Sequence, residues 1–223
     1  SGSPDQFVEE AMAGYCDLPG DRVRAVPGGV LRSTVTPRGK VAVVVGGGSG
    51  HYPAFAGYVG PGFADAAVCG DIFASPSTRY IHDVALAAER GAGVLLCYGN
   101  YAGDVLNFGF AAERLRGAGI DTRLLASCDD VASAGPNDRA RRRGIAGDLP
   151  IFKIAAAAAE QGLSLDEVER AGQLANARTA SFGVAFGGCT LPGASAPLFT
   201  VGVGQMALGL GLHGEPGLSE QPL

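Results

Sequence analysis

The stretch VAVVVGGGSGHYP, residues 41–53, sets an unbroken apolar run directly before four glycines, a serine and a histidine. A valine-rich run of this kind is typical of a buried strand, and the glycines are typical of a loop where the strand ends. Two further apolar runs, at 91–98 and 122–127, predict two more strands. With the strand expected at 40–45, they form the centre of a predicted sheet.

Segments with helical spacing of apolar residues lie between and after these strands. They predict helices at 80–90, 105–116, 151–161 and 165–179. A capping box at Ser164 and Glu167 marks the start of the last one, and a similar box at residues 3–6 opens a first helix expected to end near Gly20. Alternating strands and helices predict an α/β fold with a largely parallel or mixed sheet flanked by helices.

The chain changes character at about Ser181, where strand-like segments follow one another with no helical segment between them. These segments are 181–193, 197–201 and 206–212. We therefore predict an N-terminal α/β subdomain over residues 1–180, which carries the glycine-rich loop, and the beginning of a second, strand-rich α/β subdomain over 181–223.

Composition narrows the classes of partner. The 223 residues are 47% hydrophobic, enough for a real core, and carry a net charge of -5. Nucleic acid is not an expected partner, because a phosphate-rich polymer would be repelled. The one basic cluster is interpreted as a solvated loop rather than an anion or docking site. It consists of Arg139, Arg141, Arg142 and Arg143.

The cysteines and the hydropathy pattern suggest a location. Five scattered cysteines without a C-x-x-C pair predict neither a disulfide framework nor a zinc site, and fit a reducing cytoplasm. No apolar stretch is long enough to span a membrane, and the acidic N-terminus does not resemble a signal peptide.

The predicted topology itself locates a candidate site. In an open α/β sheet, ligands bind outside the carboxyl ends of the strands. The segments expected there are GGGSGHYP at 46–53, GNYAGD at 99–104 and CDD at 128–130.

The glycine-rich loop matches none of three well-known glycine-rich motifs for nucleotide binding or nucleophilic catalysis. His51 or Pro53 stands where a dinucleotide fingerprint needs its last glycine, a P-loop lysine is absent, and His51 also breaks the nucleophile elbow. What remains is a bare backbone at 46–50 whose N–H groups could hold a small oxygen-rich ligand faced by His51. The same loop is equally typical of a tight turn whose histidine is only hydrogen-bonded.

The other candidate residues have ordinary structural interpretations when taken alone. Asp104 precedes a predicted helix, where an aspartate is a routine N-cap. His213 enters a Gly-Glu-Pro-Gly turn, and His82 lies beside Asp83 on a predicted helix surface. Two of the three histidines thus lie in glycine-rich turns.

Four segments together resemble the dihydroxyacetone kinase family, specifically its substrate-binding, DhaK-type domain. They are GGGSGHYPAFAGYVGPGFADAAVCGDIFASPS (46–77), GNYAGDVLNFGFAAE (99–113), RRRGIAGD (141–148) and GLGLHGEPG (209–217). They occur in the family's order and span nearly the whole chain.

The resemblance implies a chemistry for each motif. His213 would attack the C2 carbonyl of a short ketose and hold it as a hemiaminal, which a polyol such as glycerol cannot form. His51 would exchange a proton with the hemiaminal oxygen or a neighbouring hydroxyl, and Asp104 would accept the proton of the phosphorylated hydroxyl. Gly48, Ser49 and Gly50 would cradle the sugar, with Ser75 as a further substrate-binding residue.

The resemblance also implies partners. The chain itself would bind no cofactor and no metal, because ATP and Mg²⁺ are expected on a separate DhaL-type domain or subunit. A homodimer and a substrate such as dihydroxyacetone are expected. The chain stops soon after GEPG, before the family's second subdomain is complete, which indicates a truncated member.

Some positions depart from the family pattern. Tyr52 and Phe55 stand where many members have glutamate and a second histidine, and Gly99 replaces a common lysine. These changes leave the ketose open between dihydroxyacetone and a four-carbon ketose such as erythrulose. A ketose sensor or regulatory module without transfer activity is the alternative function, although the presence of Asp104 favours the enzyme.

Overall fold

The computed structural model describes residues 3–18 and 22–223. The chain opens with a 3-10 turn, η1 (Pro4–Gln6), and a helix, α1 (Phe7–Cys16). The expected capping box at residues 3–6 is wrong, because the Ser3 side chain makes no capping hydrogen bond. The helix ends at Cys16, and Gly20, where we expected its end, lies outside the described residues.

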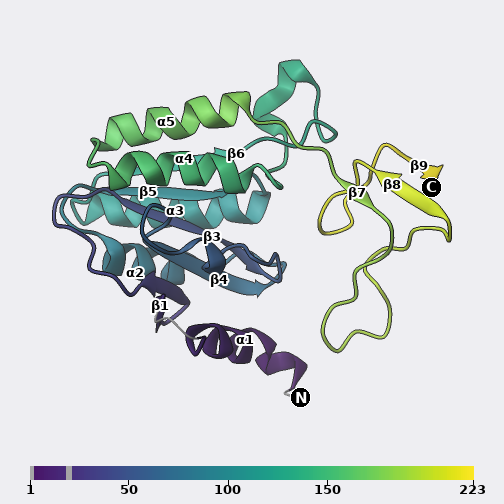
Figure 1. The fold of residues 1–223 in the computed structure, drawn as a ribbon, viewed down its shortest axis with the longest axis horizontal. Coiled ribbons are helices and arrows are strands. Elements are labelled where there is room, and N and C mark those ends of the chain that lie inside the picture. Colours follow the sequence, from purple (N-terminus) through teal and green to yellow (C-terminus); the bar gives the residue numbers. More distant parts are fainter. Residues whose placement is uncertain (1–2, 19–21) are drawn as a thin grey trace.

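A six-stranded mixed sheet forms the centre of the molecule, in the order β1-β2-β4-β3-β5-β6 (Figure 1). Strands β3 to β6 run parallel, and β1 and β2 pair antiparallel at one edge. The strands are β1 (Val23–Val26), β2 (Gly29–Arg32), β3 (Ala42–Ser49), β4 (Ala66–Ile72), β5 (Val94–Gly99) and β6 (Thr122–Ser127). The predicted fold class is confirmed.

The sequence located three of these six strands. Strand β6 has the predicted bounds, and β5 begins at Val94 within the predicted 91–98. Strands β1, β2 and β4 were not expected. Strand β3 runs through the glycines to Ser49 rather than ending at Val45, so residues 46–48 are not the loop that we predicted.

Helices cover both faces of the sheet, as Figure 1 shows. They are α2 (Thr78–Ala88), α3 (Ala102–Gly117), α4 (Asp148–Glu160) and α5 (Leu165–Arg178), joined by 3-10 turns η2 (Ala56–Tyr58) and η3 (Pro136–Arg141). Val43 and Val45 pack under α4 and α5, and Val44 packs under α2 and α3. Each fully buried side chain of this size stabilises the fold by about 1.5–3 kcal/mol. The valine run is therefore apolar without interruption because both of its faces are covered.

A buried cluster of charges joins the strands at their amino-terminal edge. Asp65 accepts hydrogen bonds from Lys40 Nζ at 2.5 Å and from Arg32 Nη1 at 3.1 Å, and Arg32 also reaches Glu160 at 2.8 Å. The backbone N–H of Val43 donates to the same carboxylate at 2.9 Å. Because each buried charge is paired, the cluster fixes β2, β3 and the start of β4 without an uncompensated ion.

Beyond α5 the described chain forms no further helix and folds into a small antiparallel sheet. Its strands are β7 (Val184–Ala185), β8 (Gln205–Leu208) and β9 (Ser219–Pro222). The strand expected at 197–201 is wrong, since those residues are irregular. The small sheet lies beside the main one, and Val131 N donates to Ser181 O at 3.0 Å where the chain crosses between them. A subdomain boundary at residue 180 stays a prediction.

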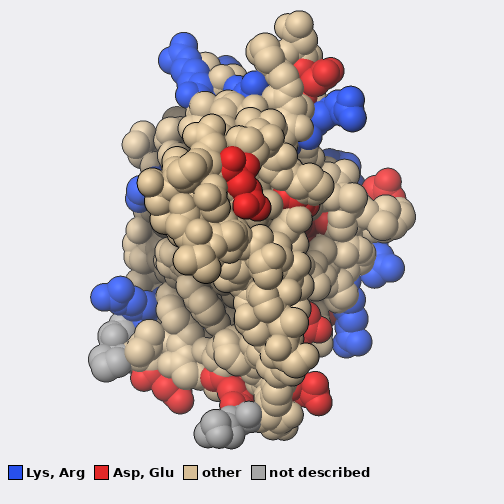
Figure 2. Space-filling model, turned by 90° about the vertical axis from the view of Figure 1, so that its right-hand side faces the viewer, with Lys and Arg blue, Asp and Glu red and all other residues tan. Residues whose placement is uncertain are grey.

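The arginine cluster is not the solvated loop that we expected. Arg139 donates to the carbonyls of Asn176 and Thr179, Arg142 is buried and donates to Ala134 O, and Arg143 pairs with Asp130 at 2.8 Å. Only Arg141 has an exposed side chain and no such partner among the described residues. Figure 2, which views the side carrying the small sheet, shows basic side chains at the edges and a middle that is uncharged apart from acidic side chains above its centre.

All five cysteines are free thiols. In the part of the chain that the structure describes, no helix combines the length and the apolar character needed to cross a membrane.

Candidate active site

The glycines after the valine run are required by packing. A Cβ at Gly47 would lie 2.3 Å from the ring of Phe55, and a Cβ at Gly48 would lie 2.6 Å from the backbone nitrogen of Ala74. Contacts this short do not occur, so only glycine fits at either position. Gly50 has φ +96, where the strand turns into the following loop. Because this segment has no side chains, Phe55 and Ala74 can pack directly against its backbone. The backbone of Gly47, Gly48 and Gly50 forms part of a cavity wall.

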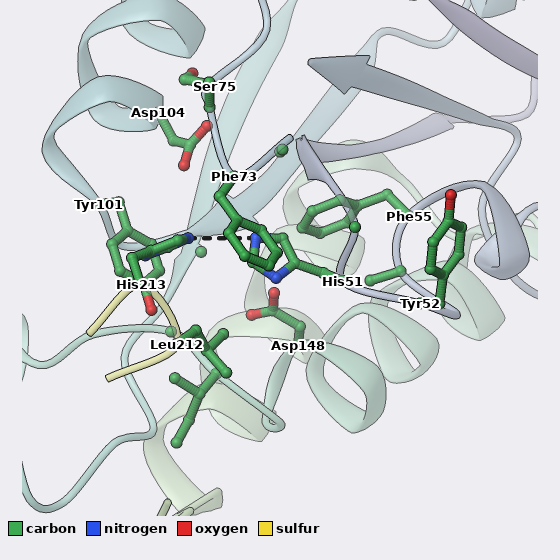
Figure 3. Close-up of a pocket in the computed structure, with 18 of the residues that line it drawn as sticks. His51, Tyr52, Phe55, Phe73, Ser75, Tyr101, Asp104, Asp148, Leu212 and His213 are labelled. Atoms are coloured by element: carbon green, nitrogen blue, oxygen red, sulfur yellow. Dashed lines mark hydrogen bonds between the residues drawn. The ribbon is translucent and has the colours of Figure 1, made fainter. Parts of the chain in front are cut away.

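A cavity of about 560 Å³ lies at the carboxyl ends of the parallel strands. Most of the predicted site residues line it, although they come from distant parts of the chain (Figure 3). They are Gly48, Gly50, His51, Ser75, Asp104 and His213. Ser49 does not line it, and its hydroxyl instead donates to Gly70 O at 2.7 Å.

The two predicted histidines meet inside this cavity. The Nε2 atoms of His51 and His213 lie 3.3 Å apart, and the rings are edge-on with centroids 5.2 Å apart. On the other side of the His213 ring, Nδ1 lies 2.9 Å from Glu215 Oε1, and the His213 backbone N–H donates to Oε2 at 3.0 Å. A carboxylate accepts, so Nδ1 carries the proton of a neutral His213 and Nε2 is left with its lone pair.

The charge states of this trio follow from burial and from one another. Burial, and then the nearby His213, lower the pKa of His51 to about 4, against an opposing effect of Glu215. Burial alone would raise the pKa of Glu215, but the hydrogen bonds from His213 and the backbone hold it below its usual value. At neutral pH, His51 is therefore uncharged and Glu215 is an anion. Since His213 Nε2 is an acceptor, His51 Nε2–H is the donor between the two rings.

Aromatic rings fix the orientation of both histidines. Phe73 stacks on His51 with centroids 4.7 Å apart, and Tyr101 meets His213 edge-on at 5.0 Å. Phe73 has φ 54, in the left-handed region that a bulky residue adopts only when its surroundings enforce it. That strained conformation presents the Phe73 ring to His51.

Asp104 is the third residue of α3, and the cap position belongs to Tyr101, so the N-cap interpretation is wrong. The side chain is buried, at 8% exposure, and its Oδ1 has no hydrogen-bond partner among the described residues. Burial raises the pKa of Asp104 to about 6, against smaller opposing effects of the Ser75 hydroxyl and of His213. A buried carboxyl with a free oxygen and a pKa close to neutrality is suited to proton transfer.

Asp148 is a cavity residue to which the sequence interpretation gave no role. It begins α4, where its buried carboxyl accepts a hydrogen bond from Ser127 Oγ. Asp129 holds the preceding turn by accepting from the backbone of Ile145 at 3.2 Å and of Gly147 at 2.8 Å. The signal that could have found Asp148 was its place at the end of the RRRGIAGD motif, directly before a predicted helix.

The three positions that depart from the family pattern also border the cavity. Phe55 is buried against Gly47, Tyr52 is 65% exposed, and Gly99 lies beside the Tyr101 ring. In Figure 3 the hydroxyl of Tyr52 points away from the histidine pair. These residues shape the wall near the histidines without adding a charge to it.

Several known proteins are similar to this chain in sequence. L-erythrulose 1-kinase of Mycolicibacterium smegmatis is 58% identical over 221 residues, which cover 99% of this chain and 39% of that protein. The dihydroxyacetone-binding subunit DhaK of PTS-dependent dihydroxyacetone kinase 2 of Listeria innocua is 44% identical, with 96% of this chain and 65% of that protein covered. The chain therefore spans well under half the length of the first relative.

Two solved structures share the fold. The dihydroxyacetone kinase of C. freundii superposes with a TM-score of 0.89 at 39% identity, covering 99% of this chain and 41% of that one. The dihydroxyacetone kinase operon co-activator DhaQ superposes with a TM-score of 0.85 at 33% identity, covering 96% of this chain and 66% of that one. A family model described as the Dak1 domain matches residues 13–223. The chain belongs to the Dak1 domain family, as the resemblance of its four motifs to dihydroxyacetone kinases predicted.

Proposed function

We propose that this chain is the ketose-binding part of a short-ketose kinase and holds its substrate covalently on His213. One observation carries the proposal. The Nε2 of His213 keeps its lone pair on the cavity side, because Nδ1 is hydrogen-bonded to Glu215 at 2.9 Å, and a ketose would displace the single contact of that lone pair, the N–H of His51 at 3.3 Å, while the buried carboxyl of Asp104 lines the same cavity. A nucleophile and a base at one small cavity suit a substrate with a carbonyl and an adjacent hydroxyl.

The covalent step balances with the residues present. As His213 Nε2 bonds to C2, the carbonyl π electrons move to oxygen, and the neutral His51 relays a proton to that oxygen by giving up its Nε2–H while its Nδ1 takes a proton from solvent. The ring of His213 gains a positive charge, which is relieved when Nδ1–H passes its proton to Glu215 Oε1, 2.9 Å away. The product is a neutral hemiaminal beside a protonated Glu215.

Asp104 would act in the transfer step. With its pKa near 6, it is mostly ionised at neutral pH and can take the proton of the ketose hydroxyl as that oxygen attacks phosphorus. The phosphoryl donor would be ATP, held with Mg²⁺ on a DhaL-type domain or subunit, where the metal neutralises charge on the phosphates. We further propose that the chain works as a homodimer in the cytoplasm.

The relatives favour a four-carbon ketose. The 58% identical relative is named an L-erythrulose 1-kinase, whereas the dihydroxyacetone-binding subunit is 44% identical. We therefore propose erythrulose as substrate, with its C1 hydroxyl at Asp104 and its C2 at His213. Dihydroxyacetone, which offers the same carbonyl and hydroxyl, would bind more weakly.

The covalent step is tested with ketose labelled with ¹³C at C2. Adduct formation moves the C2 resonance from the carbonyl region to that of a tetrahedral carbon, and native mass spectrometry gives one added ketose per chain. Glycerol, which has no carbonyl, is the control ligand. An adduct that persists in the His213→Ala variant would overturn the assignment.

A ketose sensor is the second candidate, because the operon co-activator DhaQ has the same fold at a TM-score of 0.85. Both functions need His213, but only the kinase needs a base. Turnover by the complete kinase that depends on Asp104 supports the enzyme, whereas a chain that binds ketose and transfers no phosphate with any DhaL-type partner supports the sensor.

A further inference from the structure

The cavity wall contains a buried carboxyl that the proposed chemistry leaves unused. Asp148 is 7% exposed and lines the same cavity as His51 and His213. Its Oδ1 accepts a hydrogen bond from Ser127 Oγ, and no described residue is hydrogen-bonded to Oδ2. One oxygen of this acid is therefore available to a ligand.

The two cavity carboxyls lie on different sides of the histidine pair. In the view of Figure 3, Asp104 lies above the contact between His51 and His213, and the carboxyl of Asp148 lies below it, directed toward His51. A ketose whose C2 is bound at His213 thus has Asp104 near one end of its carbon chain. Its other end would then extend toward the side of the histidine pair on which Asp148 lies.

We propose that Asp148 binds the terminal hydroxyl of the ketose on the side of C2 remote from Asp104, and so selects a four-carbon substrate through its C4 hydroxyl. This inference rests on the function proposed above, since it takes C2 to be held at His213 and the C1 hydroxyl at Asp104. A three-carbon ketose has no C4, so its last hydroxyl ends one carbon short of that position.

The surroundings of Asp148 suit a neutral hydrogen-bonding partner. Burial raises its pKa to about 8, against an opposing hydrogen bond from Ser127, and the nearby Asp129 and Asp104 add to the rise. At neutral pH the carboxyl is mostly protonated, so Oδ2–H can donate to a hydroxyl oxygen while Oδ1 keeps its bond from Ser127. A buried group of this kind discriminates against an analogue that lacks the hydroxyl, because it is then left unpaired.

The first experiment uses the unmodified chain and three ketoses. Erythrulose, 1,3-dihydroxybutan-2-one, which lacks only the C4 hydroxyl, and dihydroxyacetone are titrated by ¹³C NMR of labelled C2. We expect erythrulose to bind about tenfold more tightly than the deoxy analogue, as for one buried hydrogen bond. Equal affinity of these two ligands would overturn the inference while leaving the covalent step intact. The absence of an adduct with all three would instead overturn the proposed function.

A matched pair of variants then assigns the preference to Asp148. Asp148→Leu and Asp148→Asn have nearly the same size, and Ser127 Oγ keeps an acceptor in both because Tyr98 O lies 3.5 Å away. We expect the leucine variant to lose the tenfold preference while binding the deoxy analogue within about threefold of the parent, and the asparagine variant to keep most of the preference. If the leucine variant weakens all three ligands equally, Asp148 is structural and the inference fails. If that variant does not fold, the ligand series on the unmodified chain still decides.

Discussion

The substitution Asp104→Asn should make the protein more stable and the kinase nearly inactive. Burial raises the pKa of Asp104 from 3.8 to about 6. In the unfolded chain the carboxyl ionises near its ordinary pKa, so the stability that this group contributes is present at low pH and is lost as pH rises from about 4 to about 6. At neutral pH the ionised carboxyl therefore costs the folded state free energy.

The size of the cost follows from the shift. A rise of about two pKa units corresponds to about 3 kcal/mol. Asparagine removes this cost but also loses the favourable interaction of a carboxylate with the first turn of α3, worth about 0.3–1 kcal/mol. We expect a net gain of about 2 kcal/mol in the free energy of unfolding at neutral pH, and almost no difference from the parent at about pH 4.

Urea denaturation followed by circular dichroism measures this difference at the two pH values. Ketose binding should persist in the variant, because His213, His51 and Glu215 are untouched. Turnover with a DhaL-type partner should fall by about 10²–10⁴-fold, the usual loss when a general base is removed. A variant that is no more stable than the parent at neutral pH would refute the burial argument. Turnover within a few-fold of the parent would refute the role of Asp104 as base.

Three further substitutions test the packing and charges on which the site depends. Gly47→Ala should lower the free energy of unfolding by about 1–3 kcal/mol, because its Cβ would lie 2.3 Å from the Phe55 ring. In a double-mutant cycle, Gly47→Ala should cost less in a Phe55→Leu background than in the parent, and the difference measures the clash between the two side chains. Glu215→Gln should weaken the ketose adduct about tenfold in the ¹³C titration, since an amide can still accept from Nδ1 of His213 but cannot take up its proton; unchanged affinity would remove Glu215 from the covalent step. Asp65→Ala should cost about 3–5 kcal/mol in urea denaturation, because it removes the buried carboxylate between Lys40 and Arg32 and leaves them with Glu160, which is partly exposed, whereas a loss below about 1 kcal/mol would contradict the pairing.

The fold class could be predicted from the sequence because it depends on local patterns. The valines before the glycines are apolar on both faces, which indicates a covered strand, and the segments after them repeat with helical spacing. Strand β6 and the capping box at Ser164, where Glu167 accepts from the Ser164 N–H at 2.9 Å, were predicted correctly. Strand β4 was missed because small residues and a glycine interrupt its apolar run.

The sequence also identified His51, Asp104 and His213, because the motifs that contain them occur in the same order as in the dihydroxyacetone kinase family. The structure brings all three residues to one cavity. What the motifs could not give is the relation between them. The contact of 3.3 Å between the two histidines joins residues 162 positions apart. Which of the two rings donates depends on Glu215, because its carboxylate accepts from His213 Nδ1 and leaves Nε2 as the acceptor. Glu215 is only two residues from His213, but the hydrogen bond forms because the turn folds the carboxylate back onto Nδ1.

Tertiary structure alone decided which polar groups became buried, and this determines their chemistry. From its position before a helix, Asp104 looked like an exposed cap, but packing puts it in the third helical position with a free oxygen and a raised pKa. For Asp148 the only local signal was its place at the end of the RRRGIAGD motif, and its burial comes from the surrounding strands and turn. The glycines 46–48 looked like a loop built for a ligand and are instead strand residues that have no room for a side chain, because Val68, Phe55 and Ala74 lie where the Cβ atoms of Gly46, Gly47 and Gly48 would be. Burial and close packing are sums over neighbours distant in sequence, and a local pattern of residues does not contain them.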